Sequence, residues 1–473
     1  MRTPLESVIF HRAAPDKEWL RACSPDAHID SIVLDFAGRE DGLGGMEQVG
    51  EVEVVRHYTR LSTLNWDIDR GLYPLGSCTM KHNPRLNEAV AADPAYAAVH
   101  PEWPPQYLVQ HQRIMQELAR DLAALSGFDE VSLLPAAGAH GELTAVFMIR
   151  AYHLARGQKD RNVFLIPDSA HGTNPASAAM CGFRCVQVTS GKDGILRLES
   201  IKEHLNERLA AIMITNPNTL GVFEEEFASI ADAVHTAGGL VYMDGANFNA
   251  AMGVFQPGRI GADVMHFNLH KTFTTPHGGG GPGSGPIGFN RNLAPFAPAS
   301  GDARSIGPVK TWFGQWGMFI RAWVYIRTLG ARGLKEVTED AVLNANYIRA
   351  RLEKVLNLPI KTPTLHEVVF NDKDLPNKVI TLDIAKRLID YGFHPPTVYF
   401  PIHVHGALMI EPTETESLDE LDRFCDAMEA VVAEAASNPE HLKLAPHTTP
   451  VSRVDEVKAA KDTDLVFRPA ARN

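Results

Sequence analysis

Five short polar segments between residues 130 and 275 carry side chains that can do covalent and acid–base chemistry. One holds a lysine between a histidine and a threonine, one an aspartate after four apolar residues, and one a histidine among small residues. Ligands of open α/β sheets bind beyond the carboxyl ends of the strands, and four of these segments closely follow apolar runs, so we expect them to meet at one sheet edge. The segments are PAAGAHGE (135–142), SAHGTN (169–174), TNPNT (215–219), DGAN (244–247) and LHKT (269–272).

The lysine and the aspartate suit pyridoxal phosphate (PLP). This cofactor needs an amine for its aldehyde, an acid beside its ring nitrogen, donors for its phosphate and a flat partner for its ring. Lys271 is the candidate amine, which would hold PLP as a Schiff base, and Asp244 is the candidate acid. Ordinary interpretations stay open, because a lone lysine is usually solvated and an aspartate after a strand often caps a turn.

The remaining two requirements of PLP also have candidates. Gly138, Ala139 and His140 open a predicted helix, whose free backbone N–H groups and dipole can bind a phosphate. His171 could stack on the ring and take part in proton transfer. A plain glycine-containing helix entry and a structural histidine are the alternatives at these positions.

Two further patterns argue against other kinds of site. The tract GGGGPGSG (278–285) must be a loop, and it lacks the Lys-Ser or Lys-Thr ending of a nucleotide-binding loop, so its glycines are expected to permit close backbone approach. His403 and His405 alternate as on one strand face, but two histidines without a third ligand predict no metal site.

The elements that must position these residues alternate between strands and helices. Short apolar runs separated by helical patterns predict a largely parallel sheet with helices on both faces. Beyond Leu334 the order of helical and strand patterns changes, which predicts a smaller α+β domain. The opening residues are irregular and rich in turn residues. We therefore expect an N-terminal arm at 1–105, a large domain at 106–330 and a small C-terminal domain at 331–473. The predicted strands are 162–166, 185–188, 210–215, 240–244, 263–268 and 286–290.

Composition and charge exclude several classes of protein. The 473 residues include 45 Lys and Arg against 57 Asp and Glu, a net charge of -12, which argues against binding to nucleic acid or an anionic membrane. The first twenty residues lack the apolar core of a signal peptide, and no apolar run approaches the length of a membrane span. Five scattered cysteines suit free thiols in a reducing compartment, so a cytoplasmic protein is expected.

Six segments in order resemble glycine decarboxylase, the P-protein of the glycine cleavage system. They span most of residues 50–330, and the stretch around Lys271 is the most specific. The resemblance implies the PLP-dependent transferase fold type I (aminotransferase-like), with a mostly parallel central sheet, a smaller C-terminal α+β domain and an extended N-terminal arm. The segments are LYPLGSCTMKHNPRLNE (72–88), PAAGAHGE, DSAHGTNPASA (168–178), TNPNTLGVFE (215–224), YMDGANFNA (242–250) and HFNLHKTFTTPHGGGGPGSGPIG (266–288).

The resemblance also assigns residues to roles. The Schiff-base lysine falls on Lys271, the ring-stacking histidine on His171, the pyridinium acid on Asp244 and the phosphate-binding helix start on Gly138 and Ala139. Further active-site or cofactor positions fall on Thr219, His270, Asn247 and His140. His140 departs from the family pattern, where the fused enzymes have glutamine.

The resemblance implies an oxidoreductase that decarboxylates glycine, releases CO2 and transfers the aminomethyl group to the lipoyl arm of the carrier H-protein. The chain resembles only the lysine-bearing half of the fused enzymes. It therefore implies a paralogous subunit 1, in a heterotetramer with two copies of each subunit. The alternatives are another fold type I PLP enzyme, such as an amino-acid decarboxylase or carbon–sulfur lyase, and a non-catalytic scaffold subunit of the same fold.

Overall fold

The computed structural model divides the chain into two units. One consists of Ile68–Lys443, and the other joins Met1–Asp67 to Leu444–Asn473. The structure describes residues 6–9, 49–276, 282–463 and 466. The glycine-rich tract therefore lies partly outside the described residues, at 278–281.

The unit that joins the two ends of the chain contains two described α-helices. α1 (Glu51–Ser62) has acidic residues in its first turn and Arg60 in its last turn. These charges stabilise the helix, because each is opposite in sign to the helix dipole at its end. The carboxylate of Glu6 accepts hydrogen bonds from His57 and Arg60 of this helix. α13 (Glu456–Lys461) begins after an aspartate that caps its amino end.

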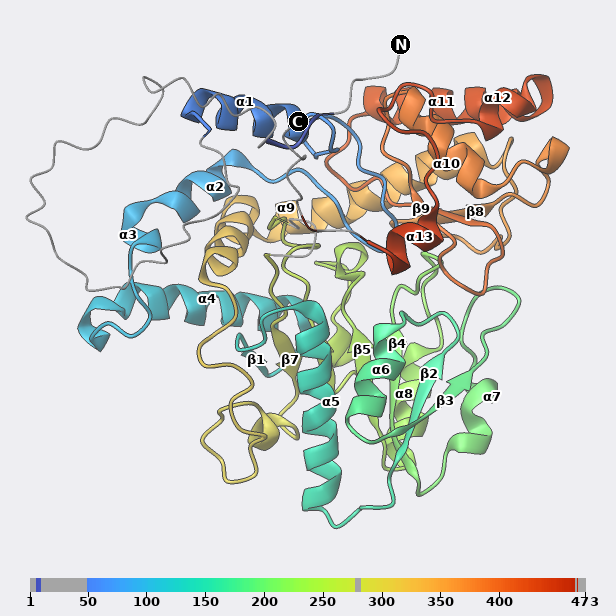
Figure 1. Cartoon of the computed structure of the whole chain (residues 1–473). Helices are drawn as coiled ribbons and strands as arrows, with labels where there is room; N and C mark the ends of the chain where they lie inside the picture. The colour runs from blue at the N-terminus through green and yellow to red at the C-terminus, as the bar shows by residue number, and fades with distance from the viewer. Residues whose placement is uncertain (1–5, 10–48, 277–281, 464–465, 467–473) are drawn as a thin grey trace, which may run out of the picture. The chain divides into compact units, whose positions relative to one another are not determined.

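A seven-stranded sheet dominates the described part of the Ile68–Lys443 unit (Figure 1). Its strands are β1 (Glu130–Ser132), β2 (Val163–Pro167), β3 (Arg184–Val188), β4 (Leu209–Thr215), β5 (Leu240–Asp244), β6 (Val264–His266) and β7 (Ile287–Phe289). The spatial order is β1-β7-β6-β5-β4-β2-β3. Neighbours from β6 to β3 are parallel, whereas β7 runs antiparallel to both β6 and β1. The predicted, mostly parallel sheet is confirmed.

Helices pack against both faces of this sheet, because successive side chains of each strand point in opposite directions. Val241 and Met243 of β5 join a core with α4 (Val109–Ser126) and α8 (Phe227–Thr236), whereas Tyr242 joins a core with α5 (Gly138–Ala155). Asp244 follows the alternation of Tyr242, so its side chain points toward the α5 side. The other α-helices described between residues 68 and 352 are α2 (Arg85–Ala92), α3 (Pro94–Ala97), α6 (Thr173–Met180), α7 (Leu198–Ile201) and α9 (Trp316–Leu352). α9 is kinked at Gly330.

A smaller antiparallel sheet follows along the chain. It contains β8 (Val368–Asn371), β9 (Thr397–Val398) and β10 (Ala407–Ile410), in the order β8-β10-β9. α10 (Thr381–Asp390) and α11 (Leu418–Ser437) share one apolar core with this sheet, and α12 (Pro439–Lys443) follows them. Figure 1 shows these elements in orange and red, beside the green strands of the large sheet.

The predicted strands of the large sheet agree with the observed ones to within two residues at each end. The expectation that the opening residues are irregular was wrong at 51–62, 85–92 and 94–97, where helices form. The short strand β1 was not predicted, because its three residues are partly exposed and give no apolar run. The proposed division at 105 and 330 remains a prediction.

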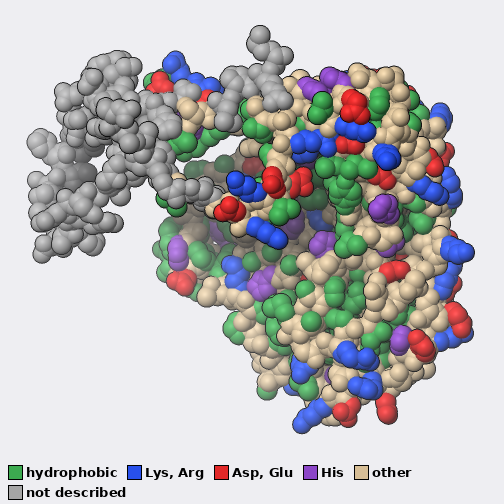
Figure 2. Space-filling model, turned by 45° about the vertical axis from the view of Figure 1, so that its right-hand side comes forward, with side chains coloured by type: hydrophobic (Ala, Val, Ile, Leu, Met, Phe, Trp, Pro, Cys, Tyr) green, Lys and Arg blue, Asp and Glu red, His purple; other side chains and the backbone are tan. Residues whose placement is uncertain are grey.

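The described surface carries mixed charges. On the face drawn in Figure 2, Lys and Arg side chains lie interspersed with Asp and Glu side chains. Among the described residues, no helix combines the length and the apolar character needed to cross a membrane.

Candidate active site

A cavity of about 280 Å³ lies at the carboxyl ends of the central parallel strands. Thr215, Asp244 and His266, the last residues of β4, β5 and β6, all line it. The structure therefore brings together eight of the nine residues singled out from the sequence, as expected for segments that follow parallel strands. These eight are Lys271, His171, His270, Asp244, Gly138, Ala139, Thr219 and Asn247.

Lys271 lies in the turn that follows β6, and its side chain is partly buried. Its Nζ donates a hydrogen bond of 2.9 Å to the backbone carbonyl of Ser77, which also lines the cavity. A residue nearly two hundred positions away along the chain thus fixes the direction of the lysine amine.

Asp244 is 3 % exposed and is held by donors on both carboxylate oxygens. Its Oδ1 accepts from the backbone N–H of Ala246 at 2.9 Å, and its Oδ2 accepts from the amide of Asn174 at 3.0 Å. Burial favours the neutral acid, but the field of His266, these hydrogen bonds and Lys271 together hold the pKa of Asp244 below its ordinary value. Asp244 is therefore a buried carboxylate that can stabilise a cation in the cavity.

Glu142 is a second cavity carboxyl, which sequence reasoning did not single out. Asn174 donates to Glu142 Oε2 at 3.0 Å and so bridges Glu142 and Asp244, and the hydroxyl of Thr173 donates to the same oxygen. Burial and the charge of Asp244 raise the pKa of Glu142 to about 7. The two carboxyls thus divide into one that is charged and one that retains a proton near neutral pH.

A buried histidine supports Asp244 from β6. His266 Nε2 lies 3.6 Å from Asp244 Oδ1 and 3.0 Å from Nδ2 of Asn268, while its Nδ1 faces the hydroxyl of Tyr242. Burial lowers the pKa of His266, although Asp244 opposes this effect, so the imidazole is neutral at physiological pH. Its sequence signal was only its place at the end of an apolar run.

The amino end of α5 offers an anion site at the cavity wall. Ala137 occupies the N-cap position and has no side chain that could accept the first helical N–H groups, so those groups remain available to a ligand. The absence of a side chain at Gly138 is required, since a Cβ there would lie 2.0 Å from Oδ1 of Asn268. Thr215 adds a buried hydroxyl for which the described residues offer no hydrogen-bond partner.

The remaining predicted residues differ in their surroundings. His171 is exposed, and burial of part of its ring together with Lys271 lowers its pKa against the opposing effect of Asp244. Thr219 donates to the carbonyl of Ser169, and Asn247 donates to the carbonyl of Pro217. His140 is not among the described residues that line the cavity, because its Nδ1 turns back to accept from the N–H of Ala136. A contact between His140 and the cofactor remains a prediction.

These residues fit PLP on observations of this structure: an uncapped helix start, a buried charged carboxylate and an amine, all on one cavity. The fold agrees, since a solved glycine decarboxylase (P-protein) of the glycine cleavage system superposes with a TM-score of 0.70 at 19% identity, covering 86% of this chain and 95% of that one. A NifS-like protein gives a TM-score of 0.61 at 15% identity, covering 76% and 100%. The family model for aminotransferase class-V matches residues 139–280. The chain thus has the fold of the fold type I, aminotransferase-like proteins.

Curated relatives narrow this class. A probable glycine dehydrogenase (decarboxylating) subunit 2 of Caldanaerobacter subterraneus is 51% identical over 431 residues, covering 88% of this chain and 89% of the relative. A protein of the same description from Pyrococcus abyssi is 48% identical over 482 residues, covering 98% and 96%. The chain belongs to the family of glycine dehydrogenase (decarboxylating) subunit 2. The family model described as glycine dehydrogenase, C-terminal domain, matches residues 337–449.

Proposed function

We propose that this chain decarboxylates glycine with PLP and passes the aminomethyl group to the lipoyl arm of a carrier H-protein, releasing CO2. Membership in the glycine dehydrogenase subunit 2 family supports the reaction. The observation that carries the proposal is that the amine of Lys271 and the carboxylate of Asp244 face one cavity at the ends of neighbouring strands.

Four residues would hold the cofactor. The amine of Lys271 would bind its aldehyde, the N–H groups at Gly138 and Ala139 would bind its phosphate, and His171 would offer its ring as a flat partner. When bound, PLP supplies an electron sink for the bond that breaks at the α-carbon of glycine. Asp244 would hold a proton on the ring nitrogen, because burial leaves it shielded from water while its own pKa stays below the ordinary value, so it remains a carboxylate.

The charge of the cavity wall favours loss of the glycine carboxylate. Lys271 is the single Lys or Arg among the described residues that line the cavity. An arginine paired with the carboxylate would stabilise the ground state more than a transition state in which neutral CO2 departs. A cavity without such a pair is therefore suited to decarboxylation. Glu142 retains a proton near neutral pH and so adds no second full negative charge beside Asp244.

The partners follow from the family. The relatives are described as subunit 2, so we propose that a paralogous subunit 1 completes the enzyme, with two copies of each subunit. The carbon left on loss of CO2 attacks one sulfur of the lipoyl disulfide, forming a C–S bond, and the other sulfur leaves and takes up a proton.

The described cysteines Cys181, Cys185 and Cys425 form no disulfide, which supports a cytoplasmic location.

The test combines the chain with subunit 1, PLP, glycine and lipoylated H-protein, and measures CO2 release. Exchange of labelled bicarbonate into the carboxyl group of glycine provides a second readout. Lys271→Ala in the same assembly is the matched control and should abolish both signals. Activity on another amino acid but not on glycine would refute the substrate assignment.

A further inference from the structure

Two fully buried carboxyls lie at one end of the small sheet, outside the residues that line the cavity. Glu367 immediately precedes β8 and Glu411 immediately follows β10, and the antiparallel register pairs Val368 with Ile410. The register therefore places the two glutamates side by side, and both are 0 % exposed. Ionisable atoms of His366, Glu367 and Glu411 lie within 4.8 Å of one another. Nothing in the proposed reaction yet uses these groups.

Both glutamates are connected to the segment that holds Lys271. Glu367 Oε2 accepts the backbone N–H of Ser77 at 2.8 Å, and Ser77 is the residue whose carbonyl accepts from Lys271. Glu411 Oε1 accepts the hydroxyl of Thr79 at 2.5 Å. Ser77 has a φ of 62°, a left-handed conformation that is uncommon for serine, and the hydrogen bonds on both sides of its peptide groups hold it there.

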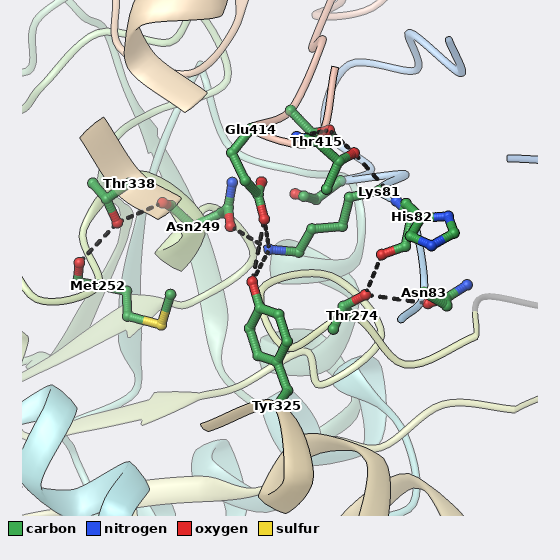
Figure 3. Close-up of polar contacts among 12 residues, drawn as sticks. Lys81, His82, Asn83, Asn249, Met252, Thr274, Tyr325, Thr338, Glu414 and Thr415 are labelled. Carbon is green, nitrogen blue, oxygen red and sulfur yellow. Dashed lines mark hydrogen bonds and ion pairs between the residues drawn. The ribbon is translucent and has the colours of Figure 1, made fainter. Parts of the chain in front are cut away.

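The same segment is anchored two residues further on. The ammonium of Lys81, 4 % exposed, donates to Glu414, Asn249 and Tyr325, at 2.7, 2.8 and 3.3 Å (Figure 3). Ser77, Thr79 and Lys81 are alternate residues of this segment, and each contacts a different glutamate. The segment LGSCTMK (75–81) therefore contacts the small domain through three alternate residues.

The charges around Lys271 come from both sheets. Burial and Glu411 raise the pKa of Glu367 well above its ordinary value, so the neutral form of Glu367 is favoured. Burial raises the pKa of Glu411 to about 7, against opposing effects of Thr79 and Lys271, and Lys81 and Glu414 also act on it. Burial and Lys271 lower the pKa of His366 to about 3, so His366 is neutral as well. Cys78, His171, Asp244 and His266 also interact electrostatically with Lys271.

We propose that Glu367 and Glu411 are positioning residues for Lys271: neutral Glu367 holds the Ser77 peptide that orients the lysine, and the ionised form of Glu411 stabilises the proton on the lysine nitrogen. The inference rests on the proposed role of Lys271 in holding PLP. It assigns to the small domain a part in setting the state of the cofactor-binding nitrogen, through a pair of residues that do not touch the cavity.

The two glutamates should respond differently to substitution. The test uses the PLP-loaded assembly with subunit 1 and follows the absorbance of the protonated cofactor linkage, at about 420 nm, as the pH is raised. Glu411→Gln removes a negative charge near the nitrogen, so the midpoint should fall by about one pH unit or more. Glu367→Gln removes a group that is already neutral and should not lower the midpoint. Thr79→Val, which removes a hydrogen bond that favours charged Glu411, should shift the midpoint in the same direction as Glu411→Gln, but by less.

The positioning role of Glu367 has a separate readout in cofactor affinity. Glu367→Ala removes the acceptor for the Ser77 N–H and should weaken PLP binding by about tenfold, whereas the amide oxygen of Glu367→Gln still accepts it and should preserve affinity. Glu224→Gln is the matched control, because Glu224 is a buried carboxyl with a pKa raised to about 7 by burial, and Lys271 is not among its electrostatic partners. It should change neither the midpoint nor the affinity.

Two outcomes would overturn the inference. One is an unchanged midpoint in both Glu411→Gln and Thr79→Val, with equal PLP affinity in Glu367→Ala and Glu367→Gln. The other is a stoichiometric metal ion in the purified assembly, because that ion and not the proton state of the pair would then set the charge beside Lys271. Failure of the proposed function looks different, since the unsubstituted assembly would then show no band at about 420 nm at any pH.

Discussion

Substitution of Gly138 by alanine tests the anion site at the start of α5. The added Cβ would lie 2.0 Å from Oδ1 of Asn268, whereas ordinary contact begins at 3.4 Å, so one of the two must move by the difference of 1.4 Å. Asn268 is held in place, because its side-chain Nδ2 contacts His266 at 3.0 Å and its backbone carbonyl accepts the N–H of Lys271 at 3.0 Å. The strain therefore displaces either the amino end of α5 or the turn that contains Lys271. Overpacking of this kind costs about 1–3 kcal/mol, which corresponds to about 5- to 150-fold weaker PLP binding.

The assay is a titration of the apo assembly with PLP, followed by the absorbance of the bound cofactor. Gly172→Ala is the matched control, because Gly172 has a φ of -60° and a Cβ there meets nothing within 4 Å. Its PLP affinity should stay within about twofold of the unsubstituted chain. Equal PLP affinities in Gly138→Ala and Gly172→Ala would refute the assignment of the phosphate to the α5 amino end.

Three further predictions concern charge. Asp244→Asn replaces a charged partner of the ring nitrogen by a neutral one and should lower kcat for CO2 release about 10- to 150-fold with cofactor still bound, whereas a loss under threefold, about 0.6 kcal/mol, would contradict its role. Glu224 has a pKa raised to about 7, so the native state holds a proton that the unfolded chain releases between about pH 4.5 and 7, and stability falls as pH rises through that window. Urea unfolding measures this loss as a fall in the free energy of unfolding of up to about 1.4 kcal/mol per pH unit, and Glu224→Gln should abolish it. Glu225→Gln, at an exposed position, is the control and should leave the loss in place. Lys81→Met leaves Glu414 buried without its cation and should cost about 3–5 kcal/mol in the same assay, and Lys81→Met with Glu414→Gln should recover part of it.

Much of the fold could be predicted because buried parallel strands leave a plain signal. β4 and β5 are buried at every position, so the runs 210–215 and 240–244 were visible as continuous apolar segments bounded by polar ones. α1 was missed since its apolar residues are few and mostly exposed, and its first-turn acids are weak signals alone.

The site could be predicted only where a residue follows a strand or opens a helix. Lys271 and Asp244 satisfy that rule. Glu142 does not, and it reaches the cavity because it lies one helical turn after Gly138, while His140 faces another direction on the same helix.

Contacts between segments that are distant along the chain could not be predicted from any pattern in the sequence. Asn174 meets Asp244 across 70 positions, and Ser77 meets Lys271 across 194. Glu367 and Glu411 become neighbours only through the register of β8 with β10. Such pairs depend on how elements pack, and a single sequence does not encode that packing in any local pattern.

The most direct test of the account is to find which residue carries the cofactor. Reduction of the PLP-loaded assembly with borohydride makes the bond between cofactor and amine permanent, and mass spectrometry of the digested chain then locates it. We expect the adduct on the peptide that contains Lys271. An adduct on any other lysine of the chain, or a fully loaded assembly with no adduct on this chain, would contradict it.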